Sequence, residues 1–132
     1  MSPKLGNGKI CYILLPAIDP AVSAAFYERV FGWEIRRREN GELTFNDGVG
    51  EVSGAWVTGC PPATQAGLLV YLMVADAEAT LQLVAASGGG VDMPVTTFGP
   101  TTVAKFIDPA GNIMGLYQEP TLADAAARIA AA

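Results

Sequence analysis

The chain has 132 residues, of which 51% are hydrophobic and 16% are charged, and its formal net charge is −5 at pH 7. This size predicts one domain with a substantial core, and the high apolar content excludes an intrinsically disordered chain. The acidic balance argues against binding to nucleic-acid backbones, and no window reaches the roughly 20 apolar residues that span a bilayer. Because the N-terminus also lacks a hydrophobic signal segment, we expect a cytoplasmic protein without membrane or nucleic-acid partners.

The first half of the chain predicts a strand, a helix and then three more strands. The apolar run KICYILLP at 9–16 predicts a buried strand, and Asp19-Pro20 then provides a capping side chain and a proline at the first helical position. Gly32 suits the left-handed end of this helix. Three strand-forming segments follow, WEIRRRE, ELTF and EVSGAWVT, and Asn40-Gly41 between the first two is a strong hairpin signal.

The second half repeats this order with an offset of 57 residues, the separation of Asp19 from Asp76. LLVYLMV at 68–74 predicts a strand, Asp76 begins a second helix, and Gly89 stands where Gly32 stands in the first half. Three strand-forming segments follow again, VDMPVTTF, TTVAKFI and NIMGLYQ. The two copies predict an α+β fold in which two βαβββ units form curved mixed sheets around a cleft.

We therefore expect a single domain over 1–132, with a first unit at 9–58 and a second unit at 68–119. The tail at 120–132, PTLADAAARIAAA, consists largely of strong helix formers and predicts a short C-terminal helix. The two cysteines form no CxxC motif, and Cys11 in the first apolar run is expected to be a small core residue.

Two segments resemble a known family. DPAVSAAFYERVFGWE at 19–34 is similar to the capped-helix segment of the glyoxalase/bleomycin-resistance/dioxygenase superfamily, which has the vicinal oxygen chelate fold. FIDPAGNIMGLYQ at 106–118 resembles the closing hairpin of that fold. Their order and spacing around a duplicated unit indicate a member of the glyoxalase-like bacterial subgroup, over about residues 9–119. By analogy with drug-binding members, the resemblance implies a homodimer.

Metal-dependent members of this superfamily hold a divalent ion with histidine and carboxylate side chains on four strands. The resemblance places one ligand position between Glu51 and Ser53, and the other three at Tyr12, Val70 and Gly115. Neutral tyrosine is a poor ligand, valine and glycine offer no side-chain donor, and the chain contains no histidine. We therefore expect no metal ion and no other cofactor, and this departure argues against glyoxalase or dioxygenase activity of the metal-dependent kind.

Alternation along the strands predicts which side chains line the cleft. The predicted ligand-binding residues are Tyr12, Leu14, Trp56, Val70, Leu72, Ile113, Gly115 and Tyr117. Around Trp56 the register stays open, and Ala55 or Val57 is the alternative there. Gly115 stands in the middle of the last strand, where glycine provides no packing, and we interpret it as a vacated ligand position.

An apolar, aromatic cavity with a few hydroxyl groups is typical of a site for a small hydrophobic molecule. The prediction is a metal-free protein that binds a small aromatic or hydrophobic ligand, and the acidic net charge favours a cationic one. The alternative is a metal-independent isomerase or lyase with Glu51 as the acid or base and a hydroxyl of Tyr12 or Tyr117 as hydrogen-bond donor. A further hypothesis is that these aromatic side chains only fill the core.

Overall fold

The computed structural model of the chain describes residues 4–64, 68–119 and 121–122. The predicted helix at 120–132 therefore falls almost entirely outside the described residues. The described residues form two compact units, one reaching Ala63 and including Pro109–Asn112, the other comprising the rest.

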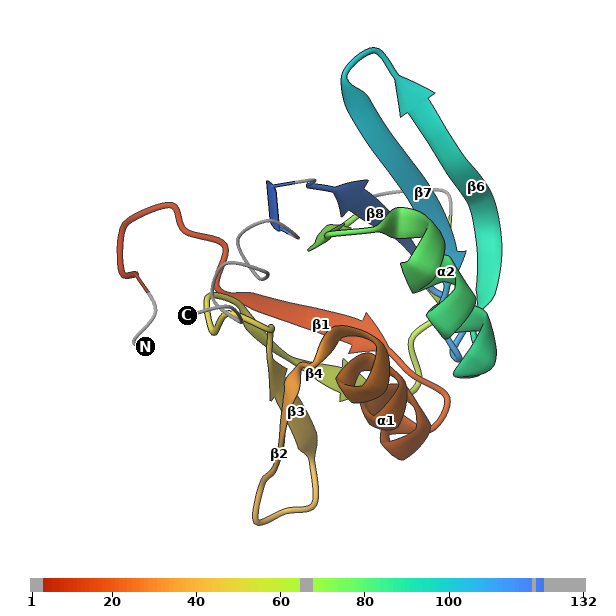
Figure 1. Cartoon of the computed structure of the whole chain (residues 1–132). Helices are drawn as coiled ribbons and strands as arrows, with labels where there is room; N and C mark the ends of the chain where they lie inside the picture. Colours follow the sequence, from red (N-terminus) through yellow and green to blue (C-terminus); the bar gives the residue numbers. More distant parts are fainter. Residues whose placement is uncertain (1–3, 65–67, 120, 123–132) are drawn as a thin grey trace, which may run out of the picture. The chain divides into compact units, whose positions relative to one another are not determined.

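The first unit is a four-stranded mixed sheet with one helix on one face (Figure 1). Its elements are β1 (Tyr12–Pro16), α1 (Pro20–Phe31), β2 (Glu34–Arg37), β3 (Leu43–Asn46) and β4 (Ser53–Val57), with strand order β1-β4-β3-β2. β1 pairs parallel with β4, and the other pairs are antiparallel. The carboxylate of Asp19 accepts a hydrogen bond from the Ala21 amide at 3.0 Å, and Gly32 ends α1 with φ of 70°, as the sequence predicts.

Aromatic rings fill the core between α1 and this sheet. The ring centroid of Trp33 lies 4.5 Å from that of Tyr27 and 4.4 Å from that of Phe45, both in stacked geometry. Trp56 continues the cluster, with its ring centroid 4.9 Å from that of Phe45. Large buried rings of this kind contribute most of the apolar surface that a small unit removes from water.

The second unit repeats the arrangement with strand order β5-β8-β7-β6. Its elements are β5 (Tyr71–Val74), α2 (Ala77–Ala86), β6 (Gly90–Phe98), β7 (Thr101–Ile107) and β8 (Ile113–Gln118), and α2 packs against β6, β7 and β8. The Asp76 carboxylate accepts a hydrogen bond from the Ala79 amide at 3.0 Å. Gly88, rather than the predicted Gly89, is left-handed, because α2 already ends at its C-cap Ser87.

The prediction of an α+β chain with two βαβββ units is thus confirmed. The expectation that Cys11 is a core residue is wrong, since β1 begins only at Tyr12 and Cys11 is exposed. Among the described residues, no helix combines the length and the apolar character that crossing a membrane requires.

The turn between β7 and β8 groups with the first unit, although the predicted boundary placed it in the second. Asn112 in this turn is fully buried. Its Nδ2 donates to the Pro16 carbonyl at 2.7 Å, and its Oδ1 accepts from the Ala63 amide at 2.8 Å. These bonds join the turn to the end of β1 and to the segment after β4. Asn112 is therefore required for these contacts as well as for the turn itself.

Candidate functional site

Each sheet is covered by a helix on one face, and the side chains of the opposite, open face are candidates for a site. In the first sheet, Tyr12 is paired with Ser53 and Leu14 with Ala55, and residues paired across strands point to the same face. Tyr12 is 45% exposed and Leu14 is 60% exposed. These two predicted ligand-binding residues therefore lie on the open face of the first sheet.

Trp56 lies on the other face. It is paired with Leu15, and both side chains are less than 5% exposed in the core beneath α1. The prediction that Trp56 lines the open face is therefore wrong. Its neighbours Ala55 and Val57, the alternatives that the sequence leaves open, share the face of Tyr12.

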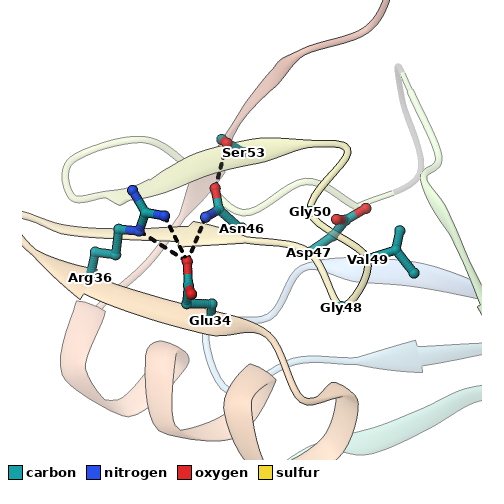
Figure 2. A pocket seen from close by; sticks show the side chains of 8 residues that line it. All are labelled: Glu34, Arg36, Asn46, Asp47, Gly48, Val49, Gly50 and Ser53. Carbon is teal, nitrogen blue, oxygen red and sulfur yellow. Dashed lines mark hydrogen bonds and ion pairs between the residues drawn. The ribbon is translucent and has the colours of Figure 1, made fainter. Parts of the chain in front are cut away.

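A network of polar side chains crosses the open face of β2, β3 and β4 (Figure 2). Glu34 Oε1 accepts from Arg36 Nε at 3.0 Å and from Asn46 Nδ2 at 2.6 Å, and Ser53 Oγ donates to Asn46 Oδ1 at 2.6 Å. The bond from Arg36, followed by that from Asn46, holds the pKa of Glu34 below its usual value. With the loop at 47–50, these residues line an open hollow of about 690 Å³. Because its polar groups already satisfy one another, this hollow is poorly suited to an apolar ligand.

The second sheet carries two rows of side chains across its four strands, on the face away from α2. One row contains Tyr71, Gly115, Lys105 and Met93, and the next contains Met73, Tyr117, Val103 and Thr96. Members of both rows, with two residues from the end of the β6–β7 hairpin, line a hollow of about 460 Å³: Tyr71, Met93, Phe98, Thr101, Val103, Lys105 and Tyr117. We call this hollow the aromatic pocket. Within the described part of the chain, its lining combines three aromatic rings with one charged side chain.

Gly115 lies beside the pocket, under the ring of Tyr71. A Cβ at this glycine would be 2.5 Å from Cδ2 and 2.6 Å from Cε2 of Tyr71, so the ring occupies the space that a side chain would need. An aromatic ring from the neighbouring strand restores packing that glycine cannot provide. The Tyr71 ring therefore fills the space beside Gly115, and this close approach explains why the strand has a glycine there.

The two predicted residues around β5 do not belong to this face. Leu72 is paired with Leu116, which is fully buried on the helix side of the sheet, and Val70 stands two positions before Leu72 in the alternation. The predicted faces are thus inverted here, and Tyr71 and Met73 take the open face, with 46% and 60% exposure.

The predicted residues of β8 keep their expected alternation. Gly115 and Tyr117 share the face of the aromatic pocket, and Tyr117 lines it. Ile113, two residues before Gly115, points to the same face but does not line the pocket. Sequence reasoning missed Phe98, Met93 and Lys105, because these belong to β6 and β7, for which the resemblance implies no ligand position.

Glu51, the candidate catalytic acid or base, lies in the loop before β4. Its Oε1 accepts from Lys9 Nζ at 2.8 Å and from the Lys4 amide at 3.3 Å. These bonds, with that from Lys9 the larger cause, hold the pKa of Glu51 below its usual value. Proton transfer at neutral pH requires a carboxyl with a pKa raised toward 7, so this ion-paired group is poorly suited to the role.

We expect the Glu51→Gln variant to lower the melting temperature at pH 7 by more than it does at pH 3. A carboxyl with a lower pKa in the folded chain stabilises the fold above its unfolded pKa, and this contribution is lost as the pH falls through the folded value. Thermal unfolding at both pH values measures the difference, with the exposed Glu39→Gln as matched control. Equal losses at the two pH values would contradict a role for the Lys9–Glu51 ion pair.

The positions to which the resemblance assigns metal ligands do not form a ligand set. Tyr12 and Ser53 offer hydroxyl groups on the first sheet, and the ring of Tyr71 takes the space beside Gly115 on the second. The carboxylate of Glu51, within the range of the fourth position, is ion-paired with Lys9. Hydroxyl groups without imidazole or a free carboxylate are poor ligands for divalent transition metals. Within the described ranges, no three His, Cys, Asp or Glu side chains lie together in a way that could hold a metal ion. The residues present therefore do not fit the metal of this fold family.

Known proteins match both the sequence and the fold of the chain. The family model of the Glyoxalase/Bleomycin resistance protein/Dioxygenase superfamily matches residues 9–115, and the chain belongs to this superfamily. A glyoxylase-like domain-containing protein of Didymella fabae is 28% identical over 124 residues, which cover 86% of this chain and 96% of that protein.

Among solved structures, a superfamily member from Sphaerobacter thermophilus DSM 20745 has a TM-score of 0.70 at 17% identity, covering 85% of this chain and 98% of that one. A glyoxalase/bleomycin resistance protein from Streptomyces sp. CB03234 has a TM-score of 0.62 at 24% identity, covering 83% of this chain and 100% of that one. At these identities the likeness establishes the fold alone.

Proposed function

We propose that the chain binds a small aromatic or hydrophobic molecule in the aromatic pocket of its second sheet, without a metal ion. The observation that carries this proposal is the exposure of three aromatic rings around one hollow: Tyr71 is 46%, Tyr117 is 37% and Phe98 is 61% exposed. A volume of about 460 Å³ lies in the range of small-molecule sites. Stacking these rings on a flat ligand removes their apolar surface from water and stabilises the complex.

Tyr12 and Leu14 on the open face of the first sheet also belong to the proposal. Their exposure leaves apolar surface that a ligand or a second copy of the chain can cover. The homodimer implied by the resemblance to drug-binding members is proposed on the same ground.

The proposal predicts that Gly115→Ala weakens the binding of a neutral naphthalene probe, naphthamide, by about tenfold. The new methyl group would overlap the Tyr71 ring and force it out of its present position in the pocket wall. Because Tyr71 is a half-exposed side chain, it can rotate toward solvent, so we expect the fold to survive. Fluorescence titration measures the dissociation constant, and circular dichroism checks the fold.

Tyr117→Ala provides a second variant, since it removes one ring of the pocket without a new contact, and a similar loss of affinity is expected. Leu83→Ala is the matched control, because Leu83 is an exposed apolar residue on α2 in the same unit, outside the pocket. Unchanged affinity in both pocket variants would contradict the proposed site.

A further inference from the structure

We infer that the aromatic pocket takes an aromatic molecule with a negatively charged substituent, such as an aromatic carboxylic acid, and that Lys105 binds the charged group. This inference rests on the proposed function and specifies the chemical class of the ligand. Lys105 stands on β7, a strand to which the resemblance assigns no ligand position.

The position of Lys105 in the sheet places its charge among apolar groups. Its cross-strand neighbours are Met93 on β6 and Gly115 on β8. Because Gly115 has no side chain, the ring of Tyr71 from the next strand fills the row on that side. Lys105 is itself half-buried. Its methylene stem therefore adds to the apolar wall, while the ammonium group provides three hydrogen-bond donors at the tip.

No described residue of the pocket compensates the charge of Lys105. The lining residues that the structure describes include no carboxylate. Lys9, Arg36 and Arg38 each form an ion pair with a glutamate, whereas Lys105 forms none within the described part of the chain. A partly buried cation beside aromatic rings gains most from a ligand that combines a flat apolar body with an anionic group. The hydroxyl of Thr101, on the same strand, adds a polar group to this wall.

The net charge of −5 does not reverse this preference. At physiological ionic strength, charges farther apart than about 8 Å are largely screened from one another. Among the described residues the carboxylates lie outside the pocket lining, and Lys105 is the charged side chain within it. Local charge therefore selects an anion, even though the chain as a whole is acidic.

The test compares naphthoate with naphthamide, which share the ring system and differ in charge. We expect the unmodified chain to bind naphthoate at least about tenfold more tightly than naphthamide. Lys105→Met should abolish that preference while naphthamide affinity stays within about threefold, because methionine retains the apolar stem. Lys105→Arg should keep the preference, and Lys4→Met, which changes an exposed lysine in the other unit, should leave both affinities unchanged.

Equal affinity of the unmodified chain for the two probes overturns the inference and leaves the proposed function in place. An unchanged preference for naphthoate in Lys105→Met also overturns the inference, because a group other than Lys105 would then bind the carboxylate of the probe. If neither probe binds the unmodified chain, the proposed function and the ligand class fail together. Loss of naphthoate binding alone in Lys105→Met, with rescue by Lys105→Arg, supports the inference.

Discussion

Gly54→Ala should lower the free energy of unfolding by about 3 kcal/mol or more. A Cβ at Gly54 would overlap the backbone carbonyl oxygen of Ile13 on β1 and the ring of Phe45 on β3. Phe45 is 2% exposed in the aromatic core and has no free space to enter. The strands β1 and β4 would have to move apart, and their parallel pairing would weaken. Urea unfolding followed by circular dichroism measures the loss.

Gly90→Ala is the matched control for this prediction, since Gly90 also lies in a strand. A Cβ there meets nothing within 4 Å, and its φ is not in the left-handed region, so the change should stay within about 0.5 kcal/mol. Gly115→Ala should fall between the two, because the Tyr71 side chain can move whereas the Ile13 carbonyl cannot. A loss in Gly54→Ala no larger than in Gly90→Ala would contradict the described contact between β1 and β4.

Asn112→Ala should destabilise the fold by about 2 to 3 kcal/mol. The substitution removes the side chain that bonds the Pro16 carbonyl and the Ala63 amide, and it leaves a small cavity where a fully buried amide group stood. The same urea unfolding experiment measures the shift in the midpoint, provided that the slope with denaturant is unchanged.

Asn40→Ala provides the comparison for Asn112. Asn40 is exposed, and its Oδ1 accepts one hydrogen bond, from the Glu42 amide at 2.9 Å. Its removal should cost less than about 1 kcal/mol, because water can replace the lost bond. Similar losses in the two variants would mean that the turn before β8 does not depend on the two bonds of Asn112.

The order of helices and strands could be predicted from the sequence, because the residues that begin helices and form turns act on their neighbours in the chain. Asp19 and Asp76 cap the two helices through contacts that span two or three residues. Asn40-Gly41 lies in the turn between β2 and β3, where Gly41 has φ of 88°. These contacts depend on neighbours in the chain, so a single sequence contains them.

The direction of side chains was predicted only in part, because a slip of one residue sends a strand's side chains to the opposite face. Tyr12 and Leu14 were placed correctly on the open face. In β5 the prediction was off by one residue, because it placed Leu72 on the open face where the structure has Tyr71. The 57-residue offset between Asp19 and Asp76 maps Leu14 onto Tyr71, so the repeat in the sequence indicated the correct residue.

Trp56 shows a different limit. Side chains of its strand alternate between the two faces, as predicted. Choosing between Trp56 and Ala55 for the open face required knowing where the other aromatic rings pack. Trp33 and Phe45 stand on separate strands or loops, and they meet Trp56 only after β2, β3 and β4 have paired. Burial of several rings in one core then decides the face.

The sequence by itself determined the superfamily, the duplicated βαβββ order and the absence of histidine ligands, since these follow from motif, spacing and composition. Only the tertiary structure decided that the ring of Tyr71 fills the place of a side chain at Gly115 and that Lys105 stands in the same row. The physical reason is strand register, which brings residues from distant parts of the chain onto one face of a sheet. The same register places a positive charge in the pocket of an acidic protein.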